Sequence, residues 1–305
     1  MCSQISEITQ KFREICAICE KKTAMNYFNL HTHSHFCDGK EAPEAYVNRA
    51  IELGFHTLGF SSHAPVPFEN KFALREERLE EYFQTIRNLQ SKYKNQIKIL
   101  LSLEIDFIPG ITKDFAEFVK AGDLDYTIGG IHLIKKKGIE ELWFIDGPLQ
   151  ERYDEGLQKL FNGHGRQGVE AYYQQVLEMI AIQKPDIIAH LDKIKMHNKN
   201  RYFSEEEGWY SDLVWKVLKY VAAETNCIIE VNTRGLYKKR AETYFPSPEI
   251  LEQIHHLKIP ITLNSDAHHP DELDKFFPEA LETLKDIGFK ELVYFEGKVR
   301  KQQSL

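Results

Sequence analysis

The sequence has no excess of basic residues and no long apolar run. Its 305 residues carry 39 Lys and Arg against 46 Asp and Glu, a net charge of −7 and a pI near 6.0. We therefore expect neither nucleic acid nor an anionic membrane as a partner. No apolar stretch approaches the ~20 residues that cross a bilayer. The first residues lack a basic region followed by an apolar block, so we expect a cytoplasmic protein.

Cysteine is also scarce, and five scattered cysteines do not suggest a disulfide framework. Cys16 and Cys19 form a C-x-x-C, a spacing compatible with a redox pair or half of a zinc site. There is no second C-x-x-C to complete a zinc knuckle. Ile8, Phe12 and Ile15 fall at helical spacing with Cys19, which favours a plain apolar helix face.

Short apolar runs alternate with amphipathic stretches along most of the chain, and this order predicts a parallel sheet covered by helices. Seven or eight such units in one chain without a Pro-, Ser- or Gly-rich linker favour a closed α/β barrel in a single domain. Residues 1–24 read as an added helix, residues 25–305 as the barrel, and 135–168 as an insertion or lid. Strands are expected at 27–30, 57–60, 97–103, 126–131, 187–189, 228–231, 261–263 and 291–295, and helices at 43–53, 76–93, 169–182, 210–224, 248–256 and 272–287.

Metal-binding residue types follow nearly every expected barrel strand. They come from the segments N-L-H-T-H-S-H-F-C-D-G, S-S-H, E-I-D, G-G-I-H, A-H-L-D, E-V-N and N-S-D-A-H. In a parallel barrel the C-terminal ends of all strands lie on one face, where active sites are built. These imidazoles and carboxylates are therefore expected to converge in one mouth.

A histidine after a strand is by itself more often a hydrogen-bonded surface group, and a lone aspartate is usually a helix N-cap. The repetition of such residues at successive strand ends favours a polynuclear metal site. His31 and His33 point to the same side of an extended segment and can chelate one ion. Surface or supporting positions suffice for the remaining histidines, which are His35, His56, His164, His197, His255, His256 and His269.

These motifs resemble the polymerase and histidinol phosphatase (PHP) superfamily of metal-dependent phosphoesterases. H-T-H…D-G, S-S-H, the glutamate after the third strand, G-G-I-H, A-H-L-D and N-S-D-A-H carry the resemblance over about residues 26 to 270. Within the superfamily, S-S-H-A-P-V-P-F, A-H-L-D-K-I-K and E-V-N-T-R-G-L-Y are similar to L-histidinol-phosphate phosphatases of histidine biosynthesis. Arg234 stands where that family usually has a small residue, which leaves the phosphate-binding details open.

The resemblance implies a distorted seven-stranded, TIM-like barrel with two to three divalent transition metal ions. His31, His33, Glu104 and Asp266 would hold the first ion, and Glu104 would bridge to a second held by His132 and His190. Asp38, His63 and His268 would hold the third. Nitrogen and oxygen ligands of this kind suit Zn, Fe or Mn. Glu104, Asp38 and Asp266 are the acidic residues expected to be catalytic.

The implied reaction is hydrolysis of a phosphomonoester by a hydroxide that bridges two metal ions. Within the subfamily the substrate would be L-histidinol phosphate, which makes the chain a phosphoric monoester hydrolase. Arg201 and Arg234 are the candidate phosphate ligands, because arginine binds phosphate bidentately. Lys195, Lys199, Lys238 and Arg240 are alternatives for that role, and Asp106 or Asp192 could orient ligand histidines.

Three other functions remain open at this point. The chain could be a PHP phosphoesterase acting on a nucleotide, a phosphotyrosine or a nucleic-acid end. It could be an amidohydrolase on a similar metal barrel, or a PHP module that binds metal without catalysis. A degenerate module should have lost ligands, and this chain lacks none of the expected set. The oligomeric state, the metal identity and the general acid are not predicted.

Overall fold

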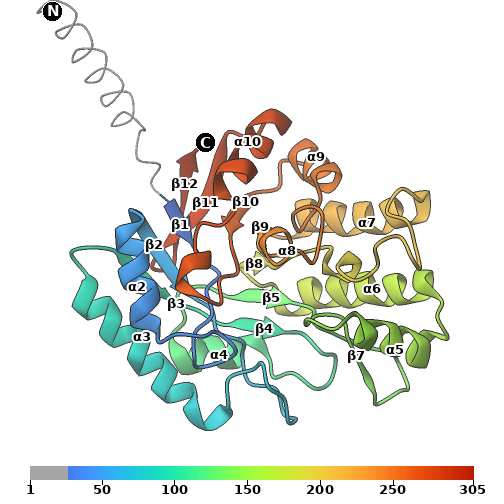
Figure 1. Cartoon of the computed structure of the whole chain (residues 1–305), viewed down its shortest axis with the longest axis horizontal. Helices are drawn as coiled ribbons and strands as arrows, with labels where there is room; N and C mark the ends of the chain where they lie inside the picture. The colour runs from blue at the N-terminus through green and yellow to red at the C-terminus, as the bar shows by residue number, and fades with distance from the viewer. Residues whose placement is uncertain (1–26) are drawn as a thin grey trace, which may run out of the picture.

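A computed structural model describes residues 27–305, in which parallel strands form a barrel surrounded by helices (Figure 1). The predicted N-terminal helix and the C-x-x-C fall in residues 1–26, outside the described residues. One sheet has the order β1-β2-β3 and the other the order β10-β9-β8-β5-β4, with every pair parallel. The strands are β1 (Tyr27–Asn29), β2 (Phe55–Phe60), β3 (Lys98–Leu101), β4 (Glu104–Asp106), β5 (Ile128–Gly130), β8 (Ile187–Ile188), β9 (Ile228–Asn232) and β10 (Ile261–Asn264).

Two isolated parallel bridges join these sheets into a closed barrel. Thr32 pairs with Ala267 beyond β1 and β10, and His63 pairs with Glu104 beyond β2. β3 and β4 are consecutive parts of one strand that breaks at residues 102–103. Counted in this way, the barrel has seven strands, and the distorted (β/α)7 fold expected from the sequence is confirmed.

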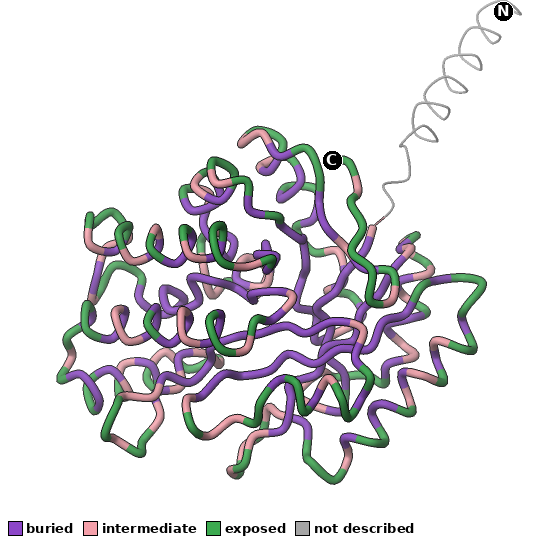
Figure 2. The backbone as a smooth tube through the Cα atoms, turned by 180° about the vertical axis from the view of Figure 1, so that it is seen from behind, coloured by how far each residue is buried: buried purple, intermediate pink, exposed green. Residues whose placement is uncertain are grey.

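Helices cover the outside of the barrel, and each buries its apolar side against the strands. Figure 2 shows buried residues concentrated along the central strands, while the surrounding helices alternate between buried and exposed residues. The helices are α2 (Pro43–Glu52), α3 (Leu79–Tyr93), α4 (Phe115–Gly122), α5 (Gln150–Phe161), α6 (Gly165–Gln183), α7 (Gly208–Glu224), α8 (Arg234–Tyr237), α9 (Pro248–His256) and α10 (Phe277–Ile287), with 3-10 turns η1 (Glu76–Arg78), η2 (Lys193–Lys195) and η3 (Pro270–Glu272). None of the helices in residues 27–305 has the length and apolar character needed to cross a membrane.

Close packing inside the barrel depends on one glycine of β2. The hydroxyl of Tyr126 donates a hydrogen bond to the Leu30 carbonyl next to β1. A Cβ atom at Gly59 would collide with that hydroxyl, so only glycine leaves room for it. This bond fixes the C-terminal end of β1, where the metal-binding sequence begins.

The segment 135–168 is an ordered part of the fold rather than a detached lid. β6 (Leu133–Lys135) and β7 (Leu142–Phe144) form an antiparallel hairpin, and α5 follows it. Trp143 is 1% exposed in the main core and packs against Tyr153 and Phe161, with ring centroids 4.8 and 5.8 Å away. A second hairpin, β11 (Glu291–Glu296) with β12 (Val299–Ser304), ends the chain, and only its first strand was predicted.

Trp143→Ala tests whether this segment belongs to the core. We expect it to lower the free energy of unfolding by about 3–5 kcal/mol, since a large buried ring leaves a cavity behind. Leu149→Ala is the matched control, because Leu149 lies in the same segment and is 49% exposed. Chemical denaturation measures both, and equal midpoints for the two variants would mean that the segment does not pack as described.

Candidate metal centre

All nine candidate metal ligands lie together at the C-terminal end of the barrel. The loop after β1 supplies three of them, the loop after β10 supplies two, and one comes from or directly follows each of β2, β4, β5 and β8. Eight are at most 7% exposed, and Asp38 is less buried. They are His31, His33, Asp38, His63, Glu104, His132, His190, Asp266 and His268.

Glu104 stands at the middle of the cluster, with its two carboxylate oxygens facing different histidines. Oε1 lies 3.0 Å from Nε2 of His190 and 3.6 Å from Nε2 of His132. Oε2 lies 3.2 Å from Nε2 of His31, 3.4 Å from Nε2 of His33 and 3.1 Å from Nδ1 of His63. A carboxylate in this arrangement can serve two neighbouring cations at once.

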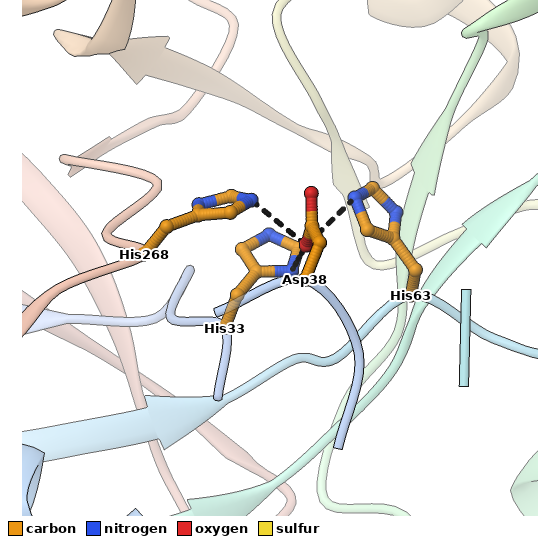
Figure 3. A group of neighbouring side chains, drawn as sticks. All are labelled: His33, Asp38, His63 and His268. Carbon is orange, nitrogen blue, oxygen red and sulfur yellow. Dashed lines mark ion pairs between the residues drawn. The ribbon is translucent and has the colours of Figure 1, made fainter. Parts of the chain in front are cut away.

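The other carboxylates each face a subset of the same imidazoles. Asp266 Oδ1 lies 3.3 Å from Nε2 of His33 and 3.8 Å from Nε2 of His31, a group whose ligand atoms could share one ion. Asp38 Oδ1 lies 3.0 Å from Nε2 of His268 and 3.9 Å from both Nε2 of His63 and Nδ1 of His33 (Figure 3). His63 also groups with Glu104 and His132, so it lies between two of the expected ion positions.

Gly39 allows Asp38 to turn back toward the histidines. A Cβ atom at this position would lie 2.5 Å from the backbone nitrogen of Ser34, closer than any packed side-chain atom can be. The H-T-H and D-G parts of the motif are thus two sides of one tight loop. The structure accounts for the D-G pair by this close approach of two backbone segments.

Whether the buried nitrogen and oxygen atoms of these side chains have hydrogen-bond partners tests whether the residues fit metal ions. Nε2 of His31, Nε2 of His33, Nδ1 of His63 and Oδ1 of Asp38 are buried, and within residues 27–305 none has a hydrogen-bond partner. Unpaired buried polar atoms are costly, and several such atoms aimed at one centre are explained by cations between them. Imidazole nitrogens and carboxylate oxygens suit divalent transition metals, so the donor set fits.

The electrostatics of the cluster agree with this. Burial alone would raise the pKa of Glu104, but the imidazoles of His31, His63 and His132 outweigh it and hold that pKa well below its usual value. Burial lowers the pKa of His33 well below normal, and neighbouring His268 and His63 add to the effect. The carboxyl group is therefore ionised and this imidazole neutral, as ligands must be.

Two further carboxylates contact candidate ligand histidines at ring nitrogens that point away from Glu104. Asp106 Oδ1 lies 2.8 Å from Nδ1 of His132. Asp106 is one of the two residues that the sequence analysis named as able to orient a ligand histidine, and this contact fits that role. Glu230 Oε1 lies 2.6 Å from Nδ1 of His31, and its other oxygen accepts the His190 amide N–H at 3.0 Å. The role of Glu230 was not predicted. Asp192, the other candidate, instead pairs with Lys195 at 2.6 Å and accepts the amide N–H of Ser247.

Glu230→Gln tests this positioning role. The amide cannot hold the His31 ring as the carboxylate does, so we expect metal affinity to fall by about 10- to 100-fold. Competition with a chelator, followed by metal analysis, measures the affinity without relying on turnover. Glu291→Gln, on the exposed start of β11, is the control. Unchanged metal retention in Glu230→Gln would contradict the role.

The structure separates the two candidate phosphate-binding arginines. Arg234 lines the cavity above the cluster, is 12% exposed and donates a hydrogen bond to the Asp266 carbonyl at 2.8 Å. Arg201 is not among the residues lining that cavity; it makes a bidentate pair with Asp154 of α5, both bonds 2.7 Å long. The sequence analysis expected Arg201 at the metal centre, and the structure does not place it there.

Of the alternative cations, one reaches the cavity. Arg240 lines it, with Nη1 3.7 Å from Asp146 Oδ1. Lys195 is held by Asp192, and Lys238 pairs with Glu272.

Lys193, which the sequence analysis did not consider for this role, is buried and lies 2.9 Å from Asp146 Oδ2. Asp146 itself also lines the cavity, next to His132 at 3.7 Å.

The fold and the cluster together define a class: an α/β barrel with a polynuclear site for divalent metals at the C-terminal ends of its strands. The PHP domain family matches residues 29–234, more than half of the chain. The chain therefore belongs to the PHP domain family, and the resemblance seen in its sequence motifs is confirmed.

Curated relatives are similar over nearly their full lengths. A histidinol-phosphatase of Lactococcus lactis is 27% identical over 282 residues, covering 90% of this chain and 96% of the relative. A histidinol-phosphatase of Bacillus subtilis is 25% identical over 272 residues, covering 83% of this chain and 97% of the relative.

Solved structures agree on the fold. A crystal structure of a Listeria monocytogenes protein superposes with a TM-score of 0.73 at 22% identity, covering 83% of this chain and 99% of the other. A crystal structure of histidinol phosphate phosphatase from Lactococcus lactis, complexed with Zn, L-histidinol and phosphate, gives a TM-score of 0.67 at 24% identity over 90% and 99% of the two chains. These likenesses establish the barrel fold.

Proposed function

We propose that this chain hydrolyses L-histidinol phosphate to L-histidinol and phosphate with the help of two to three divalent transition metal ions. The observation that carries the proposal is the convergence of nine nitrogen and oxygen side chains, with Glu104 at their centre, and of Arg234 and Arg240 lining the same cavity. The names of the Lactococcus lactis and Bacillus subtilis relatives support this substrate, as does the complex of the Lactococcus lactis protein with Zn, L-histidinol and phosphate.

We assign the ions to three neighbouring positions. His31, His33 and Asp266 would hold one, and His132 and His190 another, with Glu104 shared between the two. Asp38, His63 and His268 would hold the third. Zn, Fe and Mn all suit this donor set. We assign the activity to residues 25–305 and treat residues 1–24 as an extension.

Bound divalent ions would supply two things: a water of lowered pKa and positive charge for the phosphate oxygens. The residues of the chain do the rest. Arg234 and Arg240 would bind the non-bridging phosphate oxygens and orient the ester toward the ligand cluster. Glu104, Asp38 and Asp266 would hold the catalytic ligand arrangement rigid, with Glu104 fixing its two halves relative to each other.

A panel of phosphomonoesters tests the proposal. We expect kcat/KM for L-histidinol phosphate to exceed that for p-nitrophenyl phosphate, a nucleoside monophosphate and phosphotyrosine by at least about 10-fold, because selective sites leave polar groups unpaired with the wrong substrate. A value for L-histidinol phosphate no higher than for p-nitrophenyl phosphate would refute the substrate. A preference for the nucleotide or for phosphotyrosine would identify another PHP phosphoesterase.

A further inference from the structure

The mouth of the metal-site cavity has one apolar side in surroundings that are otherwise charged. Apart from ligands, arginines and Asp146, the cavity is lined by Phe72, Phe144, Gly147 and Pro148. The rings of Phe72 and Phe144 are stacked, with centroids 5.8 Å apart and planes inclined by 14°. They come from two segments 72 positions apart in the chain, so the barrel and not the local sequence brings them together.

Phe72 is held in place by its own loop. Asn70 Oδ1 accepts hydrogen bonds from the amides of Phe72 and Ala73 at 3.1 and 2.7 Å. Leu74 N donates to the His63 carbonyl at 3.0 Å and ties the loop to the end of β2. The Phe72 ring then meets the His63 ring edge-on, with centroids 5.3 Å apart. The aromatic side of the mouth therefore begins directly beside the ligand cluster.

Phe144 is fixed by contacts of its own segment. The amide of Ile145 donates to the His132 carbonyl at 3.0 Å, and Asp146 is 2.9 Å from buried Lys193. Gly147 has a φ of +100°, and a Cβ atom there would lie 3.0 Å from the Phe144 ring. Glycine at this position both permits the turn and leaves space for the ring.

Both rings are only half-buried, so each retains a surface that the protein does not cover. An ester whose phosphate lies at the metal cluster must direct its leaving group out through this mouth. The two stacked rings leave aromatic surface exposed to the cavity, and planar rings pack on aromatic surface more favourably than chains do. Backbone hydrogen bonds already hold both segments, which lowers the ordering cost upon binding.

We propose that Phe72 and Phe144 form a specificity wall that receives a planar ring of the leaving group. The identification of that ring with the imidazole of L-histidinol phosphate rests on the function proposed above. The preference for a planar ring rests on the two phenylalanines alone. Phe72 and Phe144 thereby determine which phosphate esters are good substrates, while the metal ligands determine that an ester is cleaved.

Phe72→Leu and Phe144→Leu test the wall, with Phe68→Leu as the matched control, since Phe68 lies in the same loop and does not line the cavity. Two ratios of kcat/KM are measured for each variant: L-histidinol phosphate to phosphoethanolamine, which lacks the ring, and phenyl phosphate to ethyl phosphate. We expect both ratios to fall by about 10-fold in the two wall variants, with metal content and the rates for the ring-free esters kept. Phe68→Leu should keep both ratios.

Unchanged ratios in both wall variants would overturn the wall, and so would an equal loss for all four esters, since the rings would then merely support His63. A wild-type protein that does not prefer L-histidinol phosphate would refute the proposed substrate. In that case a fall in the phenyl-to-ethyl ratio would still support the wall, and an unchanged ratio would overturn it.

Discussion

Glu104→Gln is expected to lower kcat/KM for phosphomonoesters by about 100- to 1,000-fold, the equivalent of several kcal/mol of transition-state stabilisation. Its two oxygens face two different sets of histidines, 3.0 Å from His190 on one side and 3.2 Å from His31 on the other. An amide offers one acceptor oxygen and an N–H₂ group that would face an imidazole ligand or a cation. Both halves of the cluster are therefore disturbed by one substitution.

Asp38→Asn is the comparison for that variant. Asp38 is at the edge of the cluster with a side chain 32% exposed, so its loss should affect one ion position and cost less activity. Steady-state kinetics together with metal analysis of both variants measure the difference. Wild-type turnover and metal content in Glu104→Gln, or a greater loss in Asp38→Asn, would contradict the central position of Glu104.

Arg234→Ala is expected to lower kcat/KM by at least about 10-fold, in line with about 1.5–3 kcal/mol for a hydrogen bond to a charged group. The guanidinium lines the cavity beside Asp266 and is mostly buried, so a phosphate at the metal cluster is within its reach. Metal content should be kept, which distinguishes lost substrate binding from a damaged ligand loop.

Arg201→Ala is the matched control for Arg234→Ala. Arg201 already satisfies its guanidinium with Asp154 and with the His197 carbonyl, 2.7 Å away. Its removal should leave kcat/KM close to the wild-type value. A loss in Arg201→Ala with wild-type behaviour of Arg234→Ala would contradict the proposed role of Arg234 in phosphate binding.

The convergence of the nine candidate ligands could be predicted because each comes from or directly follows an apolar run that is typical of a strand. In a parallel barrel that position alone places a side chain on the active-site face. Period-two alternation then pairs His31 with His33. The structure brings these strand ends together, so local sequence and global topology agree at this site.

Glu230 was noted within E-V-N but was given no positioning role, because it lies within the expected strand 228–231, where sequence patterns predict core packing. Its neighbours Ile228, Ile229 and Val231 are apolar and buried, and a carboxylate among them is fully buried as well. An ionisable residue inside such a strand is a usable signal, since burying an unpaired charge is too costly to occur without a partner. Here that partner is His31.

Arg201 and Arg234 could not be distinguished from the sequence, because both lie shortly after expected barrel strands. What separates them is Asp154, 47 positions from Arg201 on α5, a helix that the sequence analysis did not predict. Phe144 was not predicted for the same reason, since it lies in the hairpin before α5, whose strands the sequence analysis did not predict either. Tertiary partners from an unpredicted segment decide both cases.

Metal content measured alongside activity tests the central claim most directly. Elemental analysis of protein purified without chelator should give about two to three equivalents of transition metal per chain, as expected from the number of ligands. Chelation should abolish hydrolysis of L-histidinol phosphate, and added Zn or Mn should restore it in proportion to the metal bound. Full activity with less than about one equivalent of bound metal would contradict a polynuclear centre.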